Sequence, residues 1–152
     1  MQGNEMGFIR KNVADLIGMP ARRIQFYTDE RLVIPDVENP KGRGTTRRYS
    51  EFNMIEFLII KELANGGISL EKIKGIMFTV RDLLRREAPH NHLWDSETKT
   101  GGFLVIYDPI EPDGSMMGSR PGNSDTVTVR MDKAKTCLII DIDKLAKVFR
   151  SQ

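Results

Sequence analysis

The segment between Asn12 and Asp29 constrains the fold most, because it holds two short helical patterns separated by a tight turn. The first pattern has apolar residues at helical spacing, namely Val13, Leu16 and Ile17. Asn12 is expected to cap this helix and Gly18 to end it. Pro20 stands where a second helix would begin, a position that tolerates proline, and this helix is expected to run to about Asp29. Two short helices joined by a tight turn predict a helix-turn-helix.

The residues after this pair predict a small hairpin with a basic loop. Residues 32–35 have the pattern of a strand or an extended exit, residues 36–46 that of a loop, and residues 47–49 that of the second arm of the hairpin. Within eight residues that include no acid, the chain places Lys41, Arg43, Arg47 and Arg48. Such a run suits contact with phosphates, although a solvated basic loop is the commoner explanation. Residues 1–87 carry 15 Lys and Arg against 12 Asp and Glu, whereas residues 88–152 carry 8 against 9.

Two longer helices follow, and then the pattern changes. Ser50 is a good N-cap for a helix over about 51–65, and Ser69 is expected to cap a fourth helix that cannot run far past Pro89. Beyond it, the pattern predicts strands at 103–107, 126–131 and 136–140, a long loop at 108–124, and a last short helix through Phe149 that Asp141 or Asp143 caps. The expected fold is a mainly α N-terminal winged helix-turn-helix domain over 1–88, followed by a small α+β domain over 89–152.

Composition places the chain among soluble globular proteins. The 152 residues are 39% apolar and 29% charged, and no apolar run approaches the roughly 20 residues that cross a bilayer. Met1 to Met6 is polar and lacks an apolar signal segment. Cys137 is the single cysteine, is expected to be a buried core thiol, and excludes an intrachain disulfide. We therefore expect a cytoplasmic protein without membrane contact.

Several motifs in this order resemble those of MerR-family transcription regulators. Asn12–Met19 and Arg22–Tyr27 resemble the family's first helix, turn and recognition helix. The resemblance continues through Leu32-Val33, Arg47–Ser50 and Gly67–Ile73, and it covers about residues 8–77. Each motif is weak alone, but together they form a fairly specific match.

The resemblance implies a dimer that binds operator or promoter DNA and regulates transcription, and hence a bacterial, nucleoid-associated protein. Long side chains on the second helix can reach base edges in the major groove, where Arg can bridge guanine and Gln can pair with adenine. The residues expected to contact bases are Arg22, Arg23 and Gln25. Those expected along the phosphate backbone are Arg10, Lys11, Phe26, Lys41, Arg43, Arg47 and Arg48. Tyr27 and Tyr49 are expected to pack near the DNA.

The sequence departs from the family's pattern at several positions. Gln25 stands where the family usually has arginine, and Phe26 where it often has tyrosine, so that Phe26 offers van der Waals contact with sugar in place of a hydroxyl. Arg31 occupies a common glycine position, where it alters the helix exit or adds a cation. No long heptad helix, with which the family generally dimerises, follows Pro89.

Other functions fit the sequence less well. His90 and His92 near Asp95 have metal-ligand chemistry, but the spacing favours an exposed loop. An acidic loop at 108–114 is broken by prolines in a way that calcium loops are not. No cofactor motif or catalytic motif is present, so an enzyme is not expected.

The alternatives left open are a DNA-architectural or excisionase-like protein with a protein-docking C-terminal unit, and an adaptor without DNA binding. The resemblance also brings RNA polymerase and a small-molecule effector into consideration as partners.

Overall fold

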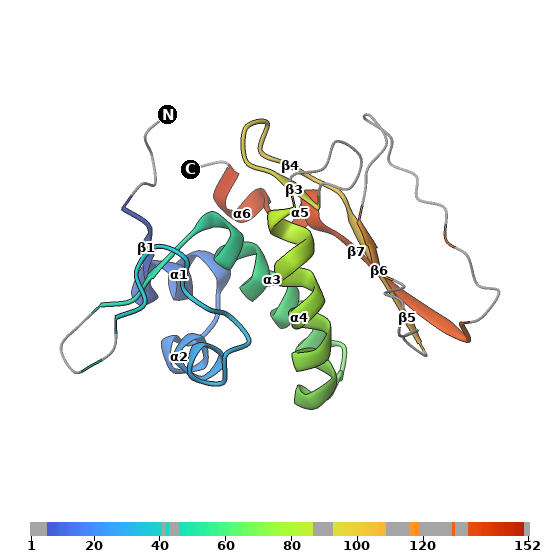
Figure 1. Ribbon diagram of the computed structural model, residues 1–152, viewed down its shortest axis with the longest axis horizontal. Helices are drawn as coiled ribbons and strands as arrows, with labels where there is room; N and C mark the ends of the chain where they lie inside the picture. The colour runs from blue at the N-terminus through green and yellow to red at the C-terminus, as the bar shows by residue number, and fades with distance from the viewer. Residues whose placement is uncertain are drawn as a thin grey trace. The chain divides into compact units, whose positions relative to one another are not determined.

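The chain divides within helix α4 (Leu70–Arg85) into a helical unit and an α+β unit (Figure 1). The boundary falls between Phe78 and Thr79. The predicted division between residues 88 and 89 lies outside the described residues and stays a prediction. The computed structural model describes residues 6–40, 42, 46–86, 93–108, 116–118, 129 and 134–150.

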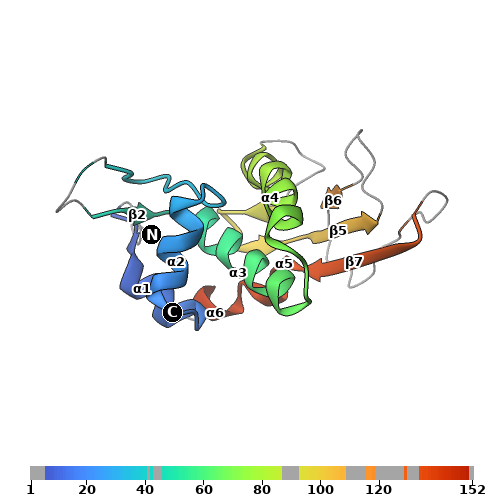
Figure 2. The ribbon, with the colours of Figure 1, turned by 90° about the horizontal axis from the view of Figure 1, so that it is seen from below.

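The first unit is mainly helical. Its elements before α4 are β1 (Phe8–Ile9), α1 (Arg10–Ile17), α2 (Ala21–Asp29), β2 (Arg48–Tyr49) and α3 (Glu51–Asn65). Figure 2 shows α1 and α2 lying together with α3 next to them. Every residue of α3 from Asn53 to Ile60 is buried, so this helix forms the centre of the unit. The predicted helices to Asp29 and over 51–65 are confirmed at those bounds.

The turn between α1 and α2 is as tight as the sequence predicts. Gly18 adopts φ 72°, a left-handed conformation that glycine takes without steric penalty. Its N–H and that of Met19 both donate to the Ala14 carbonyl, at 2.9 and 3.1 Å. Met19 is then buried. The first two helices are thereby held as one helix-turn-helix.

The predicted start of α1 is wrong. The helix begins at Arg10, and Asn12 is exposed within its first turn instead of capping it. Ile9 holds the N-cap position in an extended conformation, without a side-chain cap. The reason is a long-range pairing, because β1 is fixed against β2 and delivers the chain directly into the helix.

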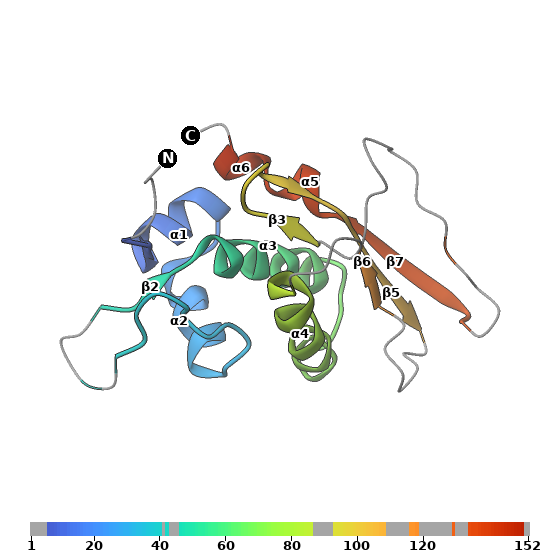
Figure 3. The ribbon, with the colours of Figure 1, turned by 45° about the horizontal axis from the view of Figure 1, so that its top comes forward.

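The predicted hairpin partner is also wrong. β2 pairs antiparallel with β1, through Phe8 with Tyr49 and Ile9 with Arg48, as Figure 3 shows beside α1. Residues 32–35 form no strand, because Leu32 and Val33 are buried as core residues at the exit of α2. A single bridge between Glu38 and Arg48 closes the loop that leads to β2.

Serine caps begin the two longer helices. Ser50 Oγ accepts from the Asn53 N–H at 3.2 Å, and Asn53 Oδ1 accepts from the Ser50 N–H at 2.9 Å, which makes a reciprocal capping box. The Lys72 N–H donates to Ser69 Oγ at 3.3 Å at the start of α4. Both serine caps are confirmed.

The second unit combines small antiparallel sheets with short helices. Its strands are β3 (Trp94–Asp95), β4 (Thr100–Gly101), β5 (Phe103–Asp108), β6 (Met116–Gly118) and β7 (Thr136–Asp141). β3 pairs with β4, and β5 lies between β6 and β7 (Figure 2). The chain ends in α5 (Ile142–Leu145) and α6 (Lys147–Arg150), where one helix was expected. This part has the expected α+β character.

Details of the second unit correct the predictions. β6 lies within the segment predicted as a long loop. The predicted strand at 126–131 lies, apart from Val129, outside the described residues. Cys137 is half-buried and so is not a core thiol. Asp141 caps α5, since its carboxylate accepts from the Lys144 N–H at 3.1 Å.

Candidate nucleic-acid interface

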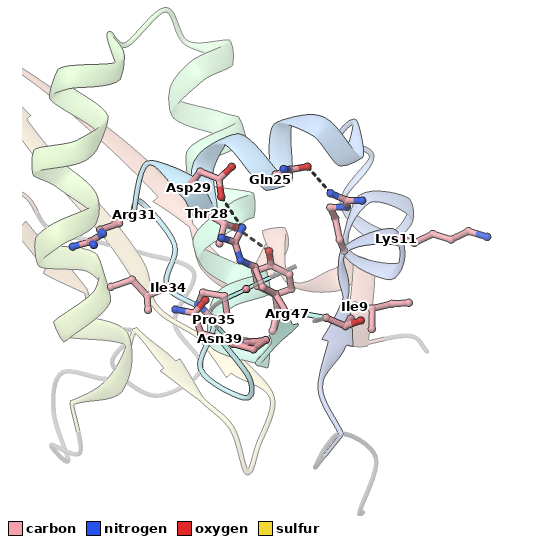
Figure 4. Close-up of a pocket in the computed structure, with 15 residues that line it drawn as sticks. Ile9, Lys11, Gln25, Thr28, Asp29, Arg31, Ile34, Pro35, Asn39 and Arg47 are labelled. Carbon is pink, nitrogen blue, oxygen red and sulfur yellow. Dashed lines mark hydrogen bonds and ion pairs between the residues drawn. The ribbon is translucent and has the colours of Figure 1, made fainter. Parts of the chain in front are cut away.

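A groove of about 880 Å³ opens between the start of α1, the end of α2 and the loop that leads to β2 (Figure 4). Among the described residues, its charged lining consists of one carboxylate, Asp29, and four cations. The cations are Arg10, Lys11, Arg31 and Arg47. Three segments that are far apart in the sequence thus bring their positive charges to one surface. Lys41 and Arg43, predicted for the same surface, lie outside the described residues.

The exposed face of α2 lies beside this groove. With about 100° per residue, Arg22 and Phe26 lie near the middle of the exposed face, whereas Arg23 and Gln25 lie on opposite flanks about 160° apart. The opposite face is buried and carries Ile24, Tyr27 and Thr28. Arg22 and Arg23 are exposed, and their side chains make no hydrogen bond or ion pair with the described residues. Phe26 is 43% exposed. Of the three residues predicted to contact bases, Gln25 alone also lines the groove.

Gln25 is held by a residue of α1. Arg10 Nη1 donates to Gln25 Oε1, which joins two side chains predicted separately for phosphate and base contact. The amide N–H groups of Gln25 keep their donor capacity, but pairing with adenine also needs Oε1. A contact of Gln25 with adenine would therefore share this oxygen with Arg10 or displace it.

Arg47 is fixed at the end of α2. Its Nη1 donates to Asp29 Oδ1 at 2.8 Å, and the two side chains are 34% and 49% exposed. The pair orients the guanidinium of Arg47 along the groove. The negative charge of Asp29 also offsets part of the positive potential there. The sequence did not point to a role for Asp29, because no pattern in it predicts that the fold brings Asp29 next to Arg47.

Tyr49 forms the floor of the groove. Thr28 Oγ1 donates its one proton to the Ile24 carbonyl at 2.8 Å, so the Tyr49 hydroxyl donates to Thr28 Oγ1 across 2.9 Å. Burial raises the pKa of the Tyr49 phenol above its ordinary value of 10.0, against smaller lowering effects of the charges of Arg47 and Arg10. Its ring meets Phe57 edge-on. The burial of Tyr49 is what a packing role requires.

Arg48 does not line the groove that Arg47 lines. Its Nη1 donates to the Met6 carbonyl at 3.1 Å, and its Nε lies 3.3 Å from Glu38 Oε2. It lines a neighbouring hollow of about 540 Å³, which shares Asn39, Pro40 and Thr46 with the groove. Arg48 thus holds the segment before β1 to the loop, and the structure does not bring it into the groove.

Arg31 lies at the exit of α2 and was not among the predicted contacts. It adopts φ 61°, a conformation that glycine favours. The glycine position that it occupies in the family's pattern was the available signal. The exposed side chain lines the groove at the end opposite Lys11 (Figure 4).

The described residues offer no other kind of site in this surface. No group of three His, Cys, Asp or Glu gathers among them as a metal ion would need, and His90 and His92 lie outside them. None of the described helices is long and apolar enough to cross a membrane. The exposed polar face of α2 and the cationic groove remain as the features suited to a polyanion.

Known proteins match the same part of the chain. The family model described as "MerR HTH family regulatory protein" matches residues 11–78. Three proteins named as uncharacterized HTH-type transcriptional regulators are 28% identical to this chain over 69 residues. One is from Mycobacterium bovis and two are from strains of Mycobacterium tuberculosis. The match covers 45% of this chain and 31% of each relative. The matched region therefore spans less than a third of the length of these relatives.

Proposed function

Because residues 11–78 match the model of the MerR helix-turn-helix family, we propose that this chain binds double-stranded DNA through α2 and the adjoining groove. The observation that carries the proposal is the pairing of two surfaces. One is the exposed face of α2, where the side chains of Arg22 and Arg23 form no ion pair with any described residue, and the other is the cation-lined groove beside it. A helix that reads bases needs flanking cations that hold it on the phosphate backbone.

The position of each side chain around the axis of α2 indicates which residue contacts the bases most directly. A helix in the major groove presents one face to the base edges, and Arg22 is nearest the middle of that face. Arg23 and Gln25 lie toward its edges, where the backbone is as close as the bases. Phe26 adds an apolar surface beside Arg22, suited to sugar carbons. Arg22 is therefore proposed as the principal base contact, with Arg23 and Gln25 supporting it.

The backbone contacts follow from the groove. Arg10 and Lys11 at the start of α1 and Arg47 before β2 would hold the phosphate backbone along the groove beside α2. The loop closed by Glu38 and Arg48 would act as the wing, and Lys41 and Arg43 would extend it along the phosphates. Arg48 would keep the wing in place and contact phosphate only at its edge.

The rest of the proposal concerns assembly and output. We propose a homodimer on a pseudo-palindromic operator, since a two-fold axis repeats the single recognition helix on the second half-site. The second unit would serve oligomerisation, an effector, or docking to RNA polymerase. In the alternative, an architectural accessory protein, the second unit docks a protein partner. The described residues after α4 favour this second candidate, because α5 and α6 have four residues each, whereas the family generally dimerises through a long helix that follows the four-helix domain.

The experiment is a selection of bound duplexes from a random library, followed by affinity measurements on the selected sequence. The regulator predicts enrichment of one inverted repeat, whereas the architectural alternative predicts clustered direct repeats or modest specificity. The double variant Arg22→Ala with Arg47→Ala should lose binding, and Lys72→Ala, an exposed cation of α4 outside the groove, should not. Unchanged affinity of the double variant at low salt would contradict both DNA-binding hypotheses.

A further inference from the structure

We propose that Arg31 is an additional phosphate-contact residue of this interface. The inference rests on the proposed DNA binding and deepens it, because it adds a cation at the far end of the groove. Three observations carry it: the backbone conformation of Arg31, the absence of an ionic partner for it among the described residues, and its place in the groove lining.

The backbone at Arg31 is one that glycine would adopt more easily. The Arg31 N–H donates to the Thr28 carbonyl at 3.0 Å and the Leu32 N–H to the Tyr27 carbonyl at 2.9 Å. This pattern ends a helix with a left-handed residue, which is usually glycine because a Cβ crowds the following carbonyl. Arg31 holds that position at φ 61°.

The end of α3 shows the same pattern with the expected residue. The Gly67 N–H donates to the Ala64 carbonyl and the Ile68 N–H to the Leu63 carbonyl, both at 3.1 Å. Gly67 has φ 80°. Within one unit, the same hydrogen-bonded turn therefore takes glycine at α3 and arginine at α2. A strained residue of this kind points to a function of its side chain.

The charge of Arg31 does not serve the fold. The two acids beside it in the sequence are engaged elsewhere, since Asp29 pairs with Arg47 at 2.8 Å and Glu30 with Lys74 at 2.8 Å. Within the part of the chain that the structure describes, Arg31 has no ion pair. Its guanidinium is thus available to an external anion.

The position of Arg31 identifies that anion as the DNA backbone. Figure 4 shows Lys11 and Arg31 at opposite ends of the groove lining, with Arg47 between them. Cations spread along one groove beside a recognition helix are suited to contact phosphates of the DNA backbone. The planar guanidinium fits a phosphate with two parallel hydrogen bonds.

The test is the salt dependence of binding to a mixed-sequence duplex, which reports phosphate contacts without knowledge of the operator. Arg31→Gly should weaken binding about fivefold to tenfold at 0.1 M salt. It should also make the slope of log K against log salt less negative by about 0.9. It should leave the thermal unfolding midpoint unchanged or raise it, because glycine suits the turn. Arg31→Lys, which keeps the charge, should retain most of the affinity.

A matched control exists in the second unit. Lys99 also adopts a left-handed conformation, at φ 57°, and lies in the turn between β3 and β4. Lys99→Gly makes the same change in charge and turn preference, and should leave affinity and salt slope unchanged. Normal binding by both the wild type and Arg31→Gly, with equal slopes, would overturn the role of Arg31 alone. Failure of the wild-type chain to bind the duplex would overturn the proposed function as well.

Discussion

Arg47 and Asp29 form an ion pair, with 2.8 Å between Arg47 Nη1 and Asp29 Oδ1, that ties the loop before β2 to the last residue of α2. The pair has two opposite consequences for a DNA-binding surface. It orients a cation along the groove, and it also places a carboxylate where a phosphate would approach. The effect of the pair on DNA binding depends on whether orientation of Arg47 or repulsion of phosphate by Asp29 is larger. Because both side chains are exposed, the orienting effect is weak.

Asp29→Asn should therefore strengthen binding to duplex DNA. Removal of the carboxylate frees Arg47 and removes a repulsion from phosphate, with about threefold to tenfold tighter binding at low salt. The stability lost should be about 0–1 kcal/mol, as is typical of exposed pairs. Fluorescence anisotropy of a labelled duplex measures the affinity. Asp15→Asn, an exposed acid of α1 outside the groove lining, is the control, and weaker binding of Asp29→Asn would show that orientation of Arg47 dominates.

Arg22→Ala should relax sequence preference more than Arg23→Ala. Arg22 lies near the middle of the exposed face of α2, so its loss should cost about 1–3 kcal/mol of discrimination against the wrong base. Arg23 lies on the flank, and its loss should weaken binding to selected and mixed-sequence duplexes by similar factors. Affinity ratios for the two duplexes measure this difference. Equal ratios for both variants would contradict the ranking of the contacts.

Tyr49→Phe should change how stability depends on alkaline pH. Burial raises the folded-state pKa of Tyr49 above 10.0, so the neutral phenol is favoured in the folded state. The unfolded phenol ionises first, and the free energy of unfolding of the wild type should fall as the pH rises above 10.0 toward the folded pKa. The variant lacks this component. At neutral pH it should lose about 0.5–1.5 kcal/mol through the missing hydrogen bond to Thr28.

Urea denaturation of both proteins across this pH range makes the comparison, since groups common to both cancel in the difference. A difference in unfolding free energy that narrows above pH 10.0 agrees with a buried, hydrogen-bonded phenol. A constant difference would mean that Tyr49 titrates alike in both states.

Ser50→Ala should destabilise the chain by about 1 kcal/mol. Ser50 Oγ caps α3 by accepting from Asn53, and it also donates to Asp36 Oδ2 at 2.6 Å. The variant loses both bonds at the start of the central helix. Denaturant unfolding measures the change, with Ser69→Ala as the comparison at α4, where the cap bond is longer at 3.3 Å. A smaller loss for Ser50→Ala than for Ser69→Ala would contradict this assignment.

Local signals in the sequence predict much of the first unit. α3 is predictable because Ser50 precedes an apolar periodic run and Gly66 and Gly67 follow it. The start of α1 is not, because it depends on the pairing of β1 with β2, whose residues lie about forty positions apart. Asn12 has the local chemistry of a cap, but a tertiary contact decides the boundary.

The candidate site is predictable in its residue types and much less in its geometry. Arg10, Gln25 and Arg47 all follow from the family resemblance and from charge. Their mutual arrangement does not, since the bond from Arg10 to Gln25 and the pair with Asp29 join separate segments. The same limit applies to β6, because Met116–Gly118 has no strand pattern of its own and is identified by its pairing with β5.

The salt dependence of duplex binding by the wild-type chain tests the central claim most directly. Each phosphate contact contributes about 0.9 to the slope of log K against log salt, so Arg10, Lys11 and Arg47 predict a slope of about −3, and a steeper one where Arg31 and the wing contribute. Titration of a mixed-sequence duplex at several salt concentrations gives this number. A slope near zero, or no binding at low salt, would contradict the assignment of this surface to DNA.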